Sequence, residues 1–114
     1  MDVKFNKVEN VAILTINGRV DVANAPKLDN VCKKILEKNE KNVLIDGTQL
    51  EFISSAGLRV LLKLAKEIKK NSGALAIAHV NGLVRNILEI SGFVELFPMF
   101  DNVVSGLLFF QDKH

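Results

Sequence analysis

The segment from Leu50 to Gly73 reads "LEFISSAGLRVLLKLAKEIKKNSG" and is the most informative about the fold. A short apolar run ends at Ile53, and apolar residues then recur at the spacing of one helix face. A strand that leads directly into a helix is typical of α/β proteins. Between the two elements stand Ser54 and Ser55, although a single hydroxyl is enough to cap a helix. The sequence therefore indicates a helix start with one serine more than capping requires.

Outward from this stretch, strand and helix patterns alternate along the chain. Runs rich in β-branched residues predict strands, and apolar residues three or four positions apart predict helices. The chain begins with two adjacent strands, after which helices and strands follow one another in turn. The predicted strands are 3–8, 11–16, 42–46 and 74–80, with 94–97 as a short fifth. The predicted helices are 24–38, one that begins at the serine pair and stops before Gly73, one that Asn81 caps and Gly92 ends, and one that starts at Asp101 or Asn102.

This order of elements predicts the fold class. Strands that alternate with helices need crossover connections, and these produce a parallel sheet. We therefore expect an α/β protein, a single domain over residues 1–114, with a mostly parallel central sheet of about four to five strands, an N-terminal antiparallel hairpin and about four helices. Right-handed crossovers gather the loops that follow the strands at one sheet edge, so the predicted loops Gly18–Ala25 and Gln49–Ser55 should meet there.

Composition narrows the classes of partner. The 114 residues are 48% apolar and 25% charged with a net charge of +2, as expected for a soluble globular protein. No aromatic residues interleave with a basic patch, and no apolar run approaches the ~20 residues of a membrane span, so neither a nucleic acid nor a membrane is expected as a partner. The polar first ten residues do not resemble a signal peptide, and a single cysteine, Cys32, fits a reducing compartment. We expect a cytoplasmic protein in which Cys32 is a buried structural thiol.

The sequence contains few of the residue patterns that catalysis requires. A serine nucleophile at Ser55 would sit on a G-x-S-x-G elbow, but Ile53 stands where the first glycine belongs. The only histidines that could act as its base are His79 and His114. No cluster with metal-ligand spacing and no glycine-rich phosphate loop occurs. The prediction is a protein that is not an enzyme and that holds neither a metal nor a cofactor.

Two hypotheses remain for the role of Ser54 and Ser55. Either serine can cap the helix by accepting a hydrogen bond from a free N–H group of the first turn. Alternatively, Ser55 receives chemistry from another protein, because Ala56 and Gly57 are small enough to let a partner backbone approach. A phosphate on Ser55 would face the free N–H groups and the positive end of the helix dipole.

The stretch "VLIDGTQLEFISSAGLRVLL" resembles the signature of STAS domains, specifically of bacterial anti-sigma factor antagonists (anti-anti-sigma factors). The resemblance is carried by the motif Ser54–Leu58 and by the loop Gly18–Asp21, and the order of segments fits over nearly the whole chain. It implies binding to an anti-sigma factor that is also a serine kinase, with release of a sigma factor. The kinase of such systems phosphorylates the serine matching Ser55 with ATP, and a metal-dependent Ser/Thr phosphatase removes the phosphate.

The resemblance also predicts the site. Many members carry aspartate before the acceptor serine where this chain has Ser54, so Ser54 stays as an alternative acceptor. The alternative function is a constitutive scaffold or sensor-complex subunit that is never phosphorylated. If small residues admit the partner, Gly57→Arg should obstruct binding and leave the fold intact. The residues expected to contact the partner are Gly18, Asp21, Ser54, Ser55, Ala56, Gly57 and Arg59.

Two surface features carry open alternatives. Asp21 either hydrogen-bonds the backbone of its own loop or belongs to the interface. The cations Arg59, Lys63, Lys66 and Lys70 share one helix face, which is either a solvated surface or a docking strip for an acidic partner helix.

Overall fold

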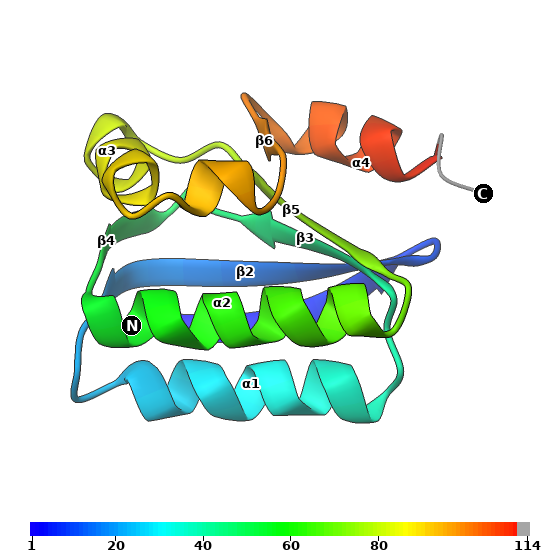
Figure 1. Ribbon diagram of the computed structural model, residues 1–114, viewed down its shortest axis with the longest axis horizontal. Helices are drawn as coiled ribbons and strands as arrows, with labels where there is room; N and C mark the ends of the chain where they lie inside the picture. The colour runs from blue at the N-terminus through cyan, green and yellow to red at the C-terminus, as the bar shows by residue number, and fades with distance from the viewer. Residues whose placement is uncertain (112–114) are drawn as a thin grey trace.

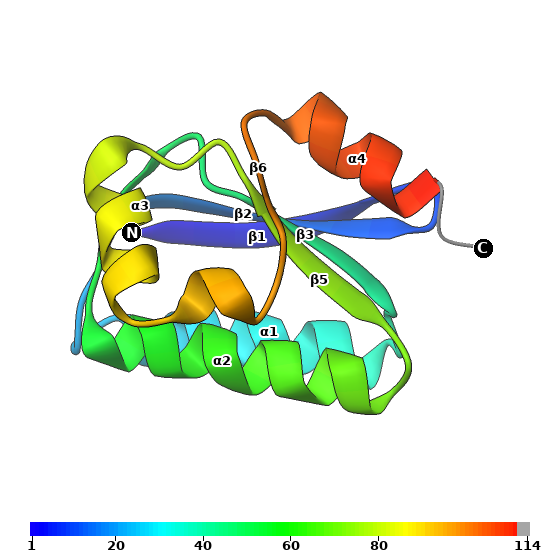
Figure 2. The same ribbon diagram turned by 45° about the horizontal axis from the view of Figure 1, so that its top comes forward.

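The computed structural model describes residues 1–111. A central sheet lies between two layers of helices (Figures 1 and 2). Helices α1 (Ala25–Glu37) and α2 (Ser55–Lys70) lie side by side on one face of the sheet. Helix α4 (Val103–Gln111) covers the other face, and α3 (Gly82–Ile90) lies against β4 (Leu50–Ile53). None of the helices within residues 1–111 is long and apolar enough to cross a bilayer.

The sheet confirms the predicted α/β class. Strands β1 and β2 form an antiparallel hairpin, and every other pairing is parallel. Within residues 1–111 the sheet has six strands, ordered β1-β2-β3-β5-β6, with β4 paired separately to β2. The bounds of the other strands are β1 Asp2–Val8, β2 Val11–Val20, β3 Asn42–Asp46, β5 Ala74–Ala78 and β6 Met99–Phe100.

Strand β2 is longer than predicted because it serves two neighbours in succession. Its first half pairs with β3, and residues 18–20, expected to form a loop, pair in parallel with β4. The register shifts between Gly18 and Arg19, and Gly18 has a φ of +92°, a conformation that a residue with a side chain rarely adopts. The partner strand comes from a distant part of the chain, so the pattern of residues 18–20 alone did not reveal the pairing.

The alternation of side chains along the strands creates two cores of unequal size. One side faces α1, α2 and α3 and includes Leu14, Ile45 and Ile77. The opposite side, with Ile13 and Leu44, forms a smaller cluster closed by Phe110 of α4. Strands buried on both faces are typical of α/β sheets, as the apolar run at 42–46 predicted.

The C-terminal region corrects one expected strand. Residues 94–97 are not a strand: Phe93–Glu95 is a 3-10 helix, and the sheet's last strand is Met99–Phe100. Phe93 and Phe97 are both buried and pack edge to face with ring centroids 5.8 Å apart. Rings four residues apart can approach this closely across a helical turn, whereas an extended strand, which rises about 3.3 Å per residue, would hold residues 93 and 97 roughly 13 Å apart.

Helix starts follow the sequence closely. Pro26 lies in the first turn of α1, as predicted. The Asn81 side chain accepts a hydrogen bond from the Val84 N–H at 2.8 Å and caps α3. Asn102 accepts one from the Ser105 N–H at 2.8 Å, which decides between the two residues proposed for the start of α4.

Candidate functional site

The ends of β2 and β4 lie at one edge of the sheet, where the two predicted loops were expected to meet, although residues 50–53, inside the predicted loop Gln49–Ser55, form strand β4. The Ser54 N–H donates to the Val20 carbonyl at 2.9 Å, and the Gly18 N–H donates to the Gln49 carbonyl at 2.8 Å. The loop that enters α1 and the start of α2 therefore lie together, at the left of Figure 1. This edge contains the residues for which the sequence predicted a role in binding.

Ser54 is the cap of α2. Its backbone is extended, with φ −84° and ψ 171°, and its Oγ accepts a hydrogen bond from the Gly57 N–H at 3.3 Å. Its carbonyl accepts the first helical hydrogen bond, from the Leu58 N–H at 2.9 Å. The hydroxyl of Ser54 is half-buried and already engaged in this structural task.

Ser55 is the first residue of α2, and its side chain is exposed. Within residues 1–111 no group hydrogen-bonds to its hydroxyl. The first turn of a helix leaves N–H groups without intrahelical acceptors, and Ser54 satisfies only one of them. The structure therefore separates the two serines into a cap and an accessible hydroxyl at a helix N-terminus.

Gly57 is buried rather than exposed. A Cβ at this position would lie 2.7 Å from the Cγ1 atoms of both Val20 and Ile53, which is closer than packed carbon atoms allow. The glycine lets α2 approach the sheet, so the expectation that Gly57→Arg leaves the fold intact is wrong. Small size at this position serves internal packing, whereas the neighbouring Ala56 is half-exposed.

Asp21 orders its own loop. Its Oδ1 accepts a hydrogen bond from the Asn24 N–H at 2.9 Å, and the Asn24 Oδ1 accepts one from the Asp21 N–H at 2.8 Å. The Asn24 amide also donates to the Arg19 carbonyl at 2.9 Å. This network supports the first of the two alternatives for Asp21, a loop residue that bonds nearby backbone.

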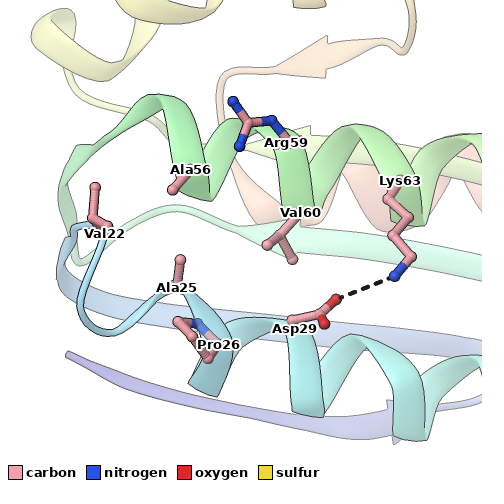
Figure 3. Close-up of a pocket in the computed structure, with 8 residues that line it drawn as sticks. All are labelled: Val22, Ala25, Pro26, Asp29, Ala56, Arg59, Val60 and Lys63. Carbon is pink, nitrogen blue, oxygen red and sulfur yellow. Dashed lines mark ion pairs between the residues drawn. The ribbon is translucent and has the colours of Figure 1, made fainter.

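A groove beside Ser55 was not foreseen from the sequence. It has a volume of about 350 Å³ and lies between the first turns of α1 and α2 (Figure 3). Ala25 and Val60 point toward each other across it, and Val22 at its end is 74% exposed. A salt bridge of 3.9 Å between Asp29 and Lys63 crosses it farther along. The sequence gives only a weak signal for the groove, an apolar Val22 directly after Asp21.

The aromatic residue of the motif also has a partner that the sequence did not indicate. The guanidinium of Arg19 lies over the ring of Phe52, 4.5 Å from its centroid. The two residues are neighbours in the pairing of β2 with β4. This cation–π contact strengthens the strand pair that holds the two loops together.

Cys32 and the possible metal ligands show no reactive arrangement among residues 1–111. Cys32 is buried, as predicted, and burial together with the charge of Asp29 raises its pKa to about 12, so the thiol stays protonated. Within residues 1–111 no three His, Cys, Asp or Glu side chains gather where they could hold a metal ion. His114 lies outside the described residues.

Known proteins share this architecture. The family model of the STAS domain matches residues 2–106. The chain is 36% identical over 99 residues to BtrV of Bordetella bronchiseptica, whose name describes an anti-sigma factor antagonist; the match covers 87% of this chain and 85% of BtrV.

Solved structures show the same fold. An anti-sigma factor antagonist from Mycobacterium paratuberculosis superposes with a TM-score of 0.86 at 20% identity, over 94% of this chain and 91% of that one. The Bacillus cell fate determinant SpoIIAA, solved in its phosphorylated form, superposes with a TM-score of 0.73 at 12% identity, over 93% of this chain and 96% of SpoIIAA.

Proposed function

The chain belongs to the STAS domain family, and we propose that it is an anti-sigma factor antagonist whose binding is switched off by phosphorylation of Ser55. In this proposal it binds an anti-sigma factor with serine kinase activity in the cytoplasm and so frees a sigma factor. The kinase transfers a phosphate from ATP to Ser55, and a Ser/Thr phosphatase removes it. The protein acts by binding other proteins and not by catalysis.

The proposal rests on the different roles of the two serine hydroxyls. Ser54 uses its hydroxyl as the helix cap, whereas the Ser55 hydroxyl is exposed and has no hydrogen-bond partner among residues 1–111. In a kinase active site this oxygen attacks the γ-phosphorus of ATP, its proton passes to a base of the kinase, and ADP leaves. The product phosphate would lie at the positive end of α2.

The remaining site residues divide into two groups in this proposal. Asp21, Ala56 and Arg59 are exposed or half-exposed and are available to the anti-sigma factor. Gly18, Ser54 and Gly57 act indirectly, because they shape the strand pair and the helix start that present the binding surface.

The expected electrostatic energies indicate that a phosphate on Ser55 changes the affinity for the partner much more than the stability of the fold. A phosphoserine carries a charge of about −1.5 to −2, and at a helix N-terminus a negative charge is stabilised by roughly 0.3–1 kcal/mol. In a complex, a partner carboxylate about 5 Å away would be repelled by roughly 3 kcal/mol per unit charge at an effective dielectric constant near 20. Per unit charge that repulsion corresponds to a loss of roughly a hundredfold in affinity, so the phosphate should cost more than this, while the fold is unharmed.

The test is phosphorylation by a purified anti-sigma factor of the serine-kinase type from the same organism. With Mg-ATP, the protein should gain one phosphate; Ser55→Ala should abolish incorporation and the matched Ser54→Ala should retain it. Mass-spectrometric mapping of the phosphate to Ser54 would overturn the residue assignment. Binding without incorporation would favour a constitutive scaffold instead.

The second part of the test measures the affinity of the phosphorylated and unmodified protein for the anti-sigma factor. Titration calorimetry should show binding weaker by more than roughly a hundredfold after phosphorylation, and Ser55→Asp, with its single charge, should weaken binding less. Melting curves of the two forms should nearly coincide. A phosphorylated protein that binds equally well, or melts several degrees lower, contradicts the switch.

A further inference from the structure

Positive charge is concentrated on one layer of the molecule. Helices α1 and α2 together hold eight lysine or arginine residues and three acidic residues, a net charge of +5. The whole chain has a net charge of +2, so the remainder carries −3. Such a separation creates a positive surface that attracts acidic partners over several ångströms.

Most of the cations along α2 have no internal partner. Arg59, Lys66 and Lys70 are exposed and have no carboxylate of residues 1–111 within ion-pair distance. Lys63 has one carboxylate oxygen of Asp29 at 3.9 Å, while Lys33 approaches the other oxygen at 3.1 Å. The positive field of this face is therefore almost uncompensated from within.

The apolar groove opens onto this charged face. Its wall includes Val22, Ala25 and Val60, and Arg59 and Lys63 also line it. A second hollow of about 260 Å³, farther along α2 around Leu62 and Lys66, shares Arg59 and Lys63 with the groove. We refer to the two hollows together as the track: it is apolar near Val22, and its charged lining is basic overall, with Arg59, Lys63 and Lys66 against Asp29 and Glu67.

We propose that this track binds an amphipathic acidic segment of the anti-sigma factor, with an apolar side chain in the groove against Val22 and carboxylates opposite Arg59, Lys63 and Lys66. The naming of the anti-sigma factor as occupant rests on the proposed function; the chemistry of the segment rests on the track itself. Charge complementarity favours carboxylates at this surface. A nucleic acid fits poorly, because α1 and α2 contain no aromatic residue on which bases could stack.

This track also links binding to the acceptor serine. Ser55 directly precedes Ala56, which lines the groove, and stands four residues before Arg59 on the same helix, within side-chain reach. A phosphate on Ser55 competes with a partner carboxylate for the Arg59 guanidinium and repels the acidic segment as a whole. The sign of the switch, with phosphate weakening binding, follows from an acidic partner.

The experiment measures association of the purified anti-sigma factor by surface plasmon resonance at low and high salt. Lys66→Glu should lower the association rate about tenfold at low salt, with a smaller effect at high salt. The matched control is Lys4→Glu, an equal change of net charge at an exposed β1 residue whose neighbour Val3 faces the main core. We expect the control to stay within about threefold of the native rate.

A second pair of variants tests the apolar end. Val22→Ser should weaken binding about tenfold through faster dissociation. Val104→Ser, at a 67% exposed valine on α4, should have no effect. All four side chains are exposed, so melting curves should remain unchanged.

The two levels of the proposal fail differently. If the native protein binds and Lys66→Glu and Val22→Ser bind equally well, the track is wrong and the proposed function stands. If the native protein binds no anti-sigma factor, the proposed function fails and the occupant named here fails with it. An effect of Lys4→Glu equal to that of Lys66→Glu would reduce the finding to net charge and overturn the track.

Discussion

The starts of α2 and α3 are two strand-to-helix corners built on the same plan. Ser54 and Asn81 are both extended, with ψ of 171° and 172°, and each accepts a hydrogen bond from the N–H three residues on. The next residue differs: Ser55 adds an unused hydroxyl at α2, whereas Gly82 adds no side chain at α3. Capping is thus common to both corners, and the accessible hydroxyl belongs to one.

The glycine near the start of each helix also differs between the two corners in how closely other atoms pack around it. Gly57 is enclosed by Val20 and Ile53, whereas a Cβ at Gly82 would meet no atom of residues 1–111 within 4 Å beyond its own helix backbone and chain neighbours. The corner of α2 is therefore held tightly against the sheet, while that of α3 is open. Ser55 therefore lies on a tightly packed helix start. Both corners have a side-chain cap, so the cap alone does not distinguish the α2 corner from the α3 corner.

The largest difference should come from alanine at the two glycines. Gly57→Ala should destabilise the protein by about 1–3 kcal/mol, because the stiff β-branched neighbours have little room to move. Gly82→Ala, at an open helical position, should stabilise it by about 0.4–1 kcal/mol. Urea unfolding of both variants measures the contrast. Equal effects of the same sign would show that the two corners are packed alike.

Removal of the caps should have the next largest effect. Ser54→Ala should cost about 1 kcal/mol of unfolding free energy. Asn81→Ala should cost more, up to about 2 kcal/mol, because the Asn81 amide also donates to the Leu50 carbonyl of β4 at 3.1 Å. Thermal and urea unfolding compare the two. A larger loss from Ser54→Ala would mean that the α2 corner depends on its cap more than the geometry indicates.

The smallest effect on stability should come from the residue proposed as the acceptor. Ser55→Ala removes a hydroxyl that bonds to nothing within residues 1–111, so the unfolding free energy should change by less than about 0.5 kcal/mol. The measurement is urea unfolding beside Ser54→Ala as the control. A loss from Ser55→Ala as large as that from Ser54→Ala would assign Ser55 a structural role and remove the contrast between the serines.

Sequence patterns were enough to predict the alternation of strands and helices apart from β4 and β6, the mostly parallel α/β class, and the caps at Ser54 or Ser55 and at Asn81. These features depend on residues a few positions apart, since helical and strand periods and capping bonds are local. The resemblance of Ser54–Leu58 to a family motif added the expected site. That information is contained in short stretches of chain and needs no knowledge of distant contacts.

The identity of the serine that caps α2, the reason for a glycine at position 57 and the place of the groove became clear only from the three-dimensional packing. Each answer depends on segments far apart in sequence: β4 pairs with the end of β2, and α2 packs on Val20. The mistaken loop at 18–20 and the mistaken exposure of Gly57 share this origin. A residue's own spacing predicts its local conformation, but its burial is set by whatever the rest of the chain places against it.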